Sequence, residues 1–178
     1  MTIAAVVLAA GEATRFGAPK QRLLLPSVLE RLREAPVDEI VVVQGAYELH
    51  GAKEAQGVPV RIVRCDEWEL GPGASLRCGL GALESGVEAA VVVLADGPRL
   101  APASIGRVLD AWRAGGGVVA ASYAGARGHP LVVGRGDWSD VPDEGLHKRR
   151  VRLVPCDDLG APGDVDTPDD LPPELAES

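Results

Sequence analysis

The chain has 178 residues, a length that suits one domain with a sizeable hydrophobic core. It is 46% hydrophobic and 25% charged, a normal balance for a globular protein. The net charge of −8 argues against a general nucleic-acid binder, which needs a basic face to neutralise phosphates. An acidic chain can still bind a nucleotide where a few cations converge.

The cysteines and the N-terminal segment give further information about the class of protein. Cys65, Cys78 and Cys156 are odd in number and form no CxxC pair, so neither a disulfide framework nor a structural zinc site is expected. The apolar N-terminal run has no basic lead-in, which favours a first strand over a signal peptide. No apolar run approaches membrane-spanning length. We therefore expect a cytoplasmic protein with no membrane partner and a single domain over residues 1–178.

Apolar runs that predict strands alternate with segments that predict helices. The strands are expected at residues 3–8, 39–44, 60–63, 89–94, 118–123, 131–133 and 151–155, and the helices at 28–35, 75–84 and 102–114. The first, second and fourth runs are almost entirely apolar, as in strands buried on both faces of a parallel sheet. The alternation predicts an α/β fold of three layers, α/β/α, with a mostly parallel sheet. In such folds ligands bind beyond the carboxyl ends of the strands.

The segment LAAGEATRFGAPKQ, residues 8–21, directly follows the first predicted strand. It does not match the P-loop pattern GxxxxGK[ST]. Its parts still suit a phosphate: Gly11 lets backbone N–H groups approach an anion, Arg15 offers a planar fork and Lys20 adds a point charge. Taken alone, the segment fits an ordinary turn with two solvated cations equally well.

Two acidic segments carry carboxylates that could bind a metal. Asp96, in VVVLADGPRL, directly follows a buried strand at the ligand-binding end of the sheet, where it suits a hard cation such as Mg²⁺. In APGDVDTPDDL, Thr167 predicts a helix N-cap and Asp170 its capping-box partner. Asp164 is left without a capping role. We therefore expect Asp164 to be a metal ligand, with Asp166 as an outer-shell or alternative ligand.

Two further segments are weaker candidates for the site. In GPGASLRCG, residues 71–79, a glycine-rich turn opens a helix whose N-terminus could meet a phosphate or a nucleobase edge, although Ser75 as a plain N-cap explains the segment too. His129 precedes a proline and is therefore expected in extended backbone. It could face an acceptor pocket or be structural.

These segments, taken in order, resemble the nucleotidyltransferases with a Rossmann-like, glycosyltransferase-A-like fold, the MobA-like NTP transferases. LAAGEATRFGAPKQ resembles the family's LAAGxSxRFGxPKQLL, and WELGPGASLRCGL resembles its WxxGxxxSLxxG segment. VVVLADGPRL resembles its LADQP segment, with Gly97 in place of Gln. ARGHPLVVGR and GDVDTPDDL resemble its RGHP and DIDTPEDL segments. Within the family, the sequence is most similar to the molybdenum cofactor cytidylyltransferases.

The resemblance implies an activity and a set of site residues. The activity is Mg²⁺-dependent transfer of CMP from CTP to a phosphorylated acceptor, molybdopterin cofactor, with release of pyrophosphate. CTP is favoured over GTP because no Asp directly precedes Lys20. A partner enzyme would receive the finished cofactor. The residues implied to bind the nucleotide are Ala10, Gly11, Arg15, Lys20, Gly71 and Ser75; those implied to hold Mg²⁺ are Asp96 and Asp164; those implied to act in catalysis are Arg15, Lys20 and Asp96.

Two alternatives stay open at this stage. The acceptor could be another small phosphorylated compound, such as phospholactate or methylerythritol phosphate. The chain could also be a non-catalytic nucleotide-binding module, because the segments after Leu25 and near Glu144 are shorter than in the family.

Overall fold

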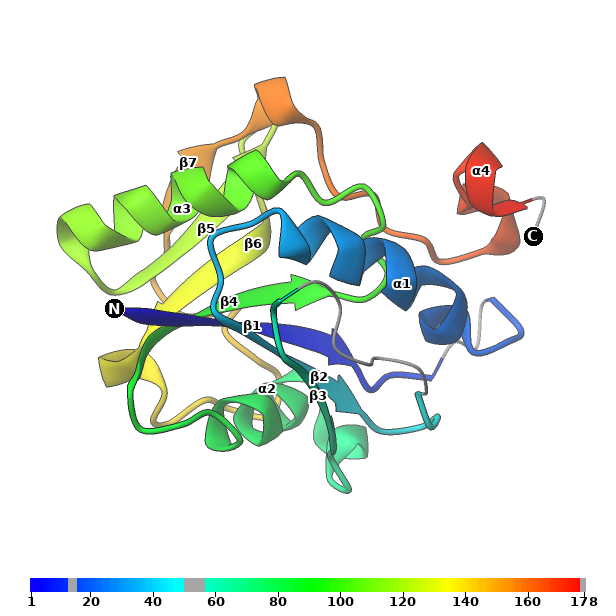
Figure 1. Cartoon of the computed structure of the whole chain (residues 1–178), viewed down its shortest axis with the longest axis horizontal. Coiled ribbons are helices and arrows are strands. Elements are labelled where there is room, and N and C mark those ends of the chain that lie inside the picture. The colour runs from blue at the N-terminus through cyan, green and yellow to red at the C-terminus, as the bar shows by residue number, and fades with distance from the viewer. Residues whose placement is uncertain (13–15, 50–56, 177–178) are drawn as a thin grey trace.

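Seven strands form one sheet in the order β3-β2-β1-β4-β6-β5-β7 (Figure 1). The computed structural model describes residues 1–12, 16–49 and 57–176. The strands are β1 (Thr2–Ala9), β2 (Glu39–Gln44), β3 (Val60–Arg64), β4 (Val87–Leu94), β5 (Val118–Tyr123), β6 (Ala126–Gly134) and β7 (Arg152–Pro155). The α-helices are α1 (Lys20–Arg33), α2 (Pro72–Gly81), α3 (Pro102–Gly115) and α4 (Pro173–Ala176).

The centre of the sheet is parallel. β1 pairs with β2 on one side and with β4 on the other, and β2 pairs with β3. The central residues of these strands, such as Val6, Val42 and Val92, are at most 1% exposed. A strand covered on both faces must be apolar at every position, which explains why these runs show no alternation. The prediction of parallel strands here is confirmed.

β6 breaks the parallel pattern. It runs antiparallel to both β4 and β5, whereas β7 is parallel to β5. β6 is also longer than the predicted run at 131–133, because it begins at Ala126 and includes His129. The sheet is nevertheless mostly parallel, and the predicted extended backbone at His129 is confirmed.

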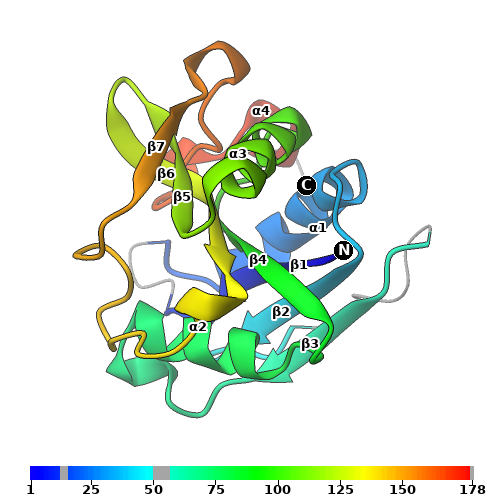
Figure 2. The same cartoon turned by 90° about the vertical axis from the view of Figure 1, so that its left-hand side faces the viewer.

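Helices cover both faces of the sheet. α1 and α3 pack on one face and α2 on the other (Figures 1 and 2). One apolar cluster joins the inner sides of α1 and α3 to one face of the strands, and a second joins α2 to the opposite face. The three-layer prediction is therefore confirmed. Within the described ranges, no helix is long and apolar enough to cross a membrane.

The first helix begins earlier than the sequence pattern suggested. α1 starts at Lys20, not at Val28, and contains Pro26 in its interior. Proline lacks the N–H of a helical hydrogen bond and normally ends a helix. Here Leu25 and Leu29 are buried against the sheet on consecutive turns, and this packing holds the helix continuous through the proline. The early start places Lys20 at the carboxyl edge of the sheet.

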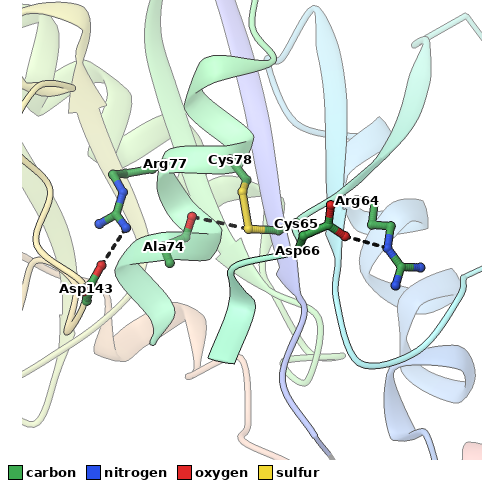
Figure 3. Close-up of a disulfide and its surroundings, with 7 residues drawn as sticks. All are labelled: Arg64, Cys65, Asp66, Ala74, Arg77, Cys78 and Asp143. Atoms are coloured by element: carbon green, nitrogen blue, oxygen red, sulfur yellow. Dashed lines mark hydrogen bonds and ion pairs between the residues drawn. A yellow bond between two sulfur atoms is a disulfide. The ribbon is translucent and has the colours of Figure 1, made fainter. Parts of the chain in front are cut away.

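Cys65 and Cys78 form a disulfide, whereas the sequence led us to expect no disulfide framework (Figure 3). Cys65 directly follows β3, and Cys78 lies on α2, which packs against the same edge of the sheet. Their Cα atoms are 5.7 Å apart, although 13 positions separate them in the chain. Packing of α2 brings them together, and sequence spacing alone does not report that packing. Cys156 is free and buried.

Candidate active site

A cluster of one cation and two acidic residues lies at the carboxyl edge of the sheet. The ammonium of Lys20 donates a 2.6 Å hydrogen bond to the carbonyl oxygen of Val165. The same Nζ is 3.3 Å from Oδ2 of Asp96 and 3.6 Å from Oδ1 of Asp166. The Lys20 side chain is only 11% exposed. The structure therefore joins the end of the first loop to both acidic segments that the sequence singled out.

Asp96 has the environment of a cation ligand. Its Oδ1 is buried and has no hydrogen-bond partner. Burial raises the pKa of this carboxyl group, the ammonium of Lys20 opposes the rise, and the carboxylate of Asp164 adds to it. A buried carboxylate oxygen without a partner is costly unless a ligand satisfies it. Asp96 therefore fits a divalent cation.

Asp164 is held beside Asp96 by backbone hydrogen bonds. The N–H of Val165 donates to the carbonyl of Asp96 at 3.1 Å, and the N–H of Arg99 donates to the carbonyl of Pro162 at 2.9 Å. Across the described segments, no group of three or more His, Cys, Asp or Glu side chains could hold a metal alone. Two carboxylates completed by substrate phosphates and water are a common arrangement for Mg²⁺.

A cavity of about 370 Å³ lies beside Lys20. We call it the glycine-loop cavity. Its walls include Ala10, Gly11, Lys20, Gln21, Trp68, Glu69, Gly71, Ser75 and Asp96. All of the predicted nucleotide-binding residues in the described ranges thus line one space. Arg15 lies outside the described residues, so its role stays a prediction.

Sequence reasoning missed three residues of this cavity. Gln21 is 5% exposed, and its Nε2 donates a 2.7 Å hydrogen bond to the carbonyl of Gly11. Its Oε1 is buried and has no hydrogen-bond partner, so it can accept a hydrogen bond from a ligand. Trp68 and Glu69 also line the cavity. The match of Trp68 to the family's WxxG segment was the signal that could have identified the region.

The start of α2 differs from the prediction. Gly71 is the N-cap, with Pro72 at the first helical position, and Ser75 lies one turn inside the helix at 4% exposure. The N–H of Gly73 donates to the carbonyl of Asp143, and the N–H groups of the next two residues donate to the carbonyl of Gly71. The first turn therefore has no N–H left for an anion, and an anion-binding helix N-terminus is wrong here. Ser75 contributes to the cavity wall instead.

Gly71 and Gly73 are required by the neighbouring loop. Gly71 has a φ of +134°, and a Cβ atom on it would collide with the carbonyl oxygen of Asp143. A Cβ atom on Gly73 would meet the carbonyl oxygen of Pro142. The loop after β6 therefore lies directly against the start of α2. Arg77 of α2 stabilises the contact between this loop and the helix through a 2.6 Å ion pair with Asp143 (Figure 3).

A second cavity of about 380 Å³ lies on the other side of the Asp96 loop. We call it the β6 cavity. Its walls include Gly97, Tyr123, Arg127, His129, Pro162 and Asp164. A third, more apolar cavity of about 610 Å³ shares Arg127 and His129 with it and extends toward α2. His129 thus lines a pocket, which is one of the two roles, pocket-facing or structural, that the sequence left open for it.

The polar groups of the β6 cavity have shifted pKa values. Burial, with a smaller contribution from the guanidinium of Arg127, lowers the pKa of His129 to about 4. Burial also lowers the pKa of Arg127. Arg127 donates a 2.9 Å hydrogen bond to the carbonyl of Leu146, and no ion pair joins it to a carboxylate of the described chain. The cavity therefore offers one cation and one neutral imidazole.

The final acidic segment is capped as predicted. Oδ2 of Asp170 accepts hydrogen bonds from the backbone N–H of Thr167 at 2.9 Å and of Asp166 at 3.1 Å. These bonds hold the pKa of Asp170 below its usual range. The cap fixes the chain directly after Val165, whose carbonyl binds Lys20.

A family model described as the MobA-like NTP transferase domain matches residues 5–154. The fold is that of the nucleotidyltransferases. Because the match covers most of the chain, the protein belongs to the MobA-like NTP transferase family. No curated protein is a significant match to the chain.

Solved structures with the same fold include two mycobacterial relatives. Rv0371c from Mycobacterium tuberculosis H37Rv is 32% identical, with 100% of both chains covered and a TM-score of 0.75. The Rv0371c homologue from Mycobacterium sp. strain JC1 is 28% identical, with 98% of this chain and 96% of that chain covered and a TM-score of 0.76. A nucleotidyl transferase from Methanothermobacter, 23% identical with 95% and 94% covered and a TM-score of 0.72, shares the fold.

Proposed function

We propose that this protein transfers a nucleoside monophosphate, CMP from CTP, to a phosphorylated acceptor and releases pyrophosphate. One observation carries the proposal. Asp96 lines the glycine-loop cavity, Asp164 lines the β6 cavity, and the charge of Asp164 acts on Asp96. Two carboxylates therefore lie where two separate cavities meet. A donor in one cavity and an acceptor in the other would react beside them.

The glycine-loop cavity suits the nucleoside triphosphate. Lys20 is at its edge, and its ammonium can bind phosphate oxygens and stabilise the departing pyrophosphate. Arg15 is expected to add a second cation from the same loop. Gln21 offers an unpaired acceptor to a hydroxyl or amino group of the nucleotide. The preference for CTP rests on the family resemblance of the segment before Lys20.

The carboxylates suit a divalent metal. The unpaired Oδ1 of Asp96 supports this, and so does a structure of Rv0371c in complex with manganese, which has 100% of both chains covered at 28% identity and a TM-score of 0.71. Asp96 and Asp164 would hold Mg²⁺ or Mn²⁺. When bound, the cation would neutralise charge between the two phosphates and polarise the α-phosphate.

The β6 cavity suits the acceptor. Arg127 can pair with the acceptor's phosphate, and the neutral imidazole of His129 can exchange hydrogen bonds with a polar group. An oxygen of the acceptor phosphate would attack the α-phosphorus of the triphosphate. The bond from the α-phosphorus to the bridging oxygen would break, and that oxygen would leave with pyrophosphate. The nucleophile is already an anion, so positioning and cations matter more than a base.

Molybdopterin cofactor is the acceptor that the family resemblance favours. The third cavity adds apolar space beside Arg127, which suits an acceptor larger than a simple sugar phosphate. Phospholactate and methylerythritol phosphate remain alternatives. A partner enzyme that takes the product also remains an expectation.

Pyrophosphate release, measured with each NTP, Mg²⁺ or Mn²⁺ and each candidate acceptor, tests the proposal. We expect turnover with CTP and molybdopterin and none with Asp96→Asn. Asp110→Asn is the matched control, because Asp110 is exposed on α3 and, among the residues that the structure describes, pairs only with Arg113. Turnover with another acceptor would correct the substrate. Nucleotide binding without turnover on any acceptor would support the non-catalytic module and overturn the proposal.

A further inference from the structure

We propose that Gly97 is a positioning residue for Asp164. The inference rests on the proposed function, since it concerns the carboxylate pair that would hold the metal. Gly97 directly follows Asp96, and it stands where the family pattern has Gln. Gly97 has no side chain and therefore no chemical role of its own. We infer its role from the residue that packs against it, Pro162.

Pro162 packs against Gly97 at the distance of direct contact. A Cβ atom built on Gly97 would lie 2.8 Å from Cβ of Pro162, closer than two carbon atoms can pack. The other neighbours of that Cβ atom, the carbonyl oxygens of Leu94 and Gly163, would be 3.7 and 3.8 Å away, which is ordinary contact. Pro162 alone is therefore incompatible with a side chain at position 97.

The same approach fixes Asp164. Two backbone hydrogen bonds hold the segment to the Asp96 loop, one through the carbonyl of Pro162 and the other through the N–H of Val165. Asp164 lies between these two bonds, and Lys20 binds the carbonyl of Val165 directly after it. A shift of Pro162 away from residue 97 would therefore move Asp164 relative to Asp96.

This contact also explains how the chain can depart from the family pattern. Any residue with a Cβ atom at position 97, Gln included, requires the segment containing Pro162 to lie farther out. Gly97 and Pro162 thus act as a matched pair: the absent side chain admits the proline ring. Small displacements of groups that orient metal ligands commonly weaken metal binding.

A double-mutant cycle tests the inference. The variants are Gly97→Ala, Pro162→Gly and the two together. Gly106→Ala is the control, because a Cβ atom on Gly106 of α3 would meet nothing within 4 Å. Neither glycine has a positive φ, so the added methyl group introduces no backbone strain. Mn²⁺ affinity is read by electron paramagnetic resonance in the presence of CTP, CTP affinity is read without metal, and thermal unfolding reports the fold.

We expect Gly97→Ala to weaken Mn²⁺ binding by about tenfold. CTP affinity without metal should stay at the wild-type value. In the Pro162→Gly background, Gly97→Ala should cause no further loss of Mn²⁺ affinity, because the Cβ atom of Pro162 that would collide with the new methyl group is absent. If Gly97→Ala does not fold and the double variant does, the contact is confirmed by that rescue.

Wild-type Mn²⁺ affinity in Gly97→Ala overturns the inference and leaves the proposed function intact. An equal loss in both backgrounds, or a folding failure that Pro162→Gly does not repair, also overturns it. If the wild-type protein binds neither CTP nor Mn²⁺, the proposed function fails, and the inference fails with it.

Discussion

The ammonium of Lys20 lies 3.3 Å from Oδ2 of Asp96, although 76 positions separate the two residues in the chain. The pair joins the glycine-rich loop of the first strand to the acidic loop of the fourth. Both side chains are largely buried, at 11% and 24% exposure. Each charge is therefore stabilised in part by the other, although for Asp96 the effect of burial outweighs that of the ammonium.

Lys20→Met should destabilise the protein because it leaves the Asp96 carboxylate buried without its cation. We expect the free energy of unfolding to fall by about 1–3 kcal/mol. Adding Asp96→Asn should recover most of that loss, since the neutral amide needs no counter-charge. Urea denaturation of the two single variants and the double variant measures the coupling. Additive effects would show that the two side chains do not interact.

Asp96→Asn should abolish turnover while stabilising the fold at neutral pH. We expect kcat to fall by at least about 100-fold, as for loss of a principal electrostatic group. The raised pKa means that the folded protein holds the Asp96 proton more tightly than the unfolded chain. Wild-type stability therefore loses this contribution as pH rises from the unfolded value near 3.8 through the higher folded value.

The stability difference between Asp96→Asn and wild type should therefore be largest near pH 7 and shrink below pH ~4. Thermal unfolding of both proteins across this pH range measures it. Asp110→Asn, which removes an exposed carboxylate outside the site, is the control for the substitution itself. A difference that grows on acidification would mean that the charged form of Asp96 is stabilising.

Reduction of the Cys65–Cys78 disulfide should lower stability. The bond closes a loop of 13 residues that contains Trp68, Gly71 and Ser75 of the cavity wall. Closing a loop of this size contributes about 3 kcal/mol by restricting the unfolded chain. We expect a lower unfolding temperature and weaker CTP binding in the presence of dithiothreitol.

Cys78→Ser should mimic the reduced protein and respond no further to dithiothreitol. Cys156→Ser is the control, because Cys156 is free and its loss should leave the response to dithiothreitol unchanged. Intact-mass measurement after denaturation in the presence of a thiol-alkylating reagent should count one free thiol before reduction and three after it. Three reactive thiols without reductant would contradict the bond.

His129 should stay neutral over the pH range in which histidine normally titrates. Its folded pKa of about 4 lies below the unfolded value of 6.5. The folded state therefore binds fewer protons, and the stability it contributes is present above pH 6.5 and lost as pH falls toward 4. NMR titration of the imidazole measures this directly. A His129 midpoint near 6.5 would contradict the buried, cation-facing environment.

The sequence alone predicted the layers of the fold and the general position of the site. Uninterrupted apolar runs can be satisfied only by strands covered on both faces, so β1, β2 and β4 were identifiable. The carboxyl ends of parallel strands share one edge, which is why Asp96 and the glycine-rich loop were expected together. The Thr167–Asp170 cap was predictable because it involves residues only three positions apart.

Tertiary packing decided the rest. Burial of the α1 leucines overrode the helix-breaking tendency of Pro26. The N-cap of α2 is Gly71, not Ser75, and the loop after β6 packs against this end of the helix. Contact between α2 and the end of β3 produced the Cys65–Cys78 disulfide. Gly97 was visible in the sequence as a departure from a pattern. Only its contact with Pro162, a residue distant in the chain, shows why, because van der Waals exclusion acts through space and leaves no local sequence signal.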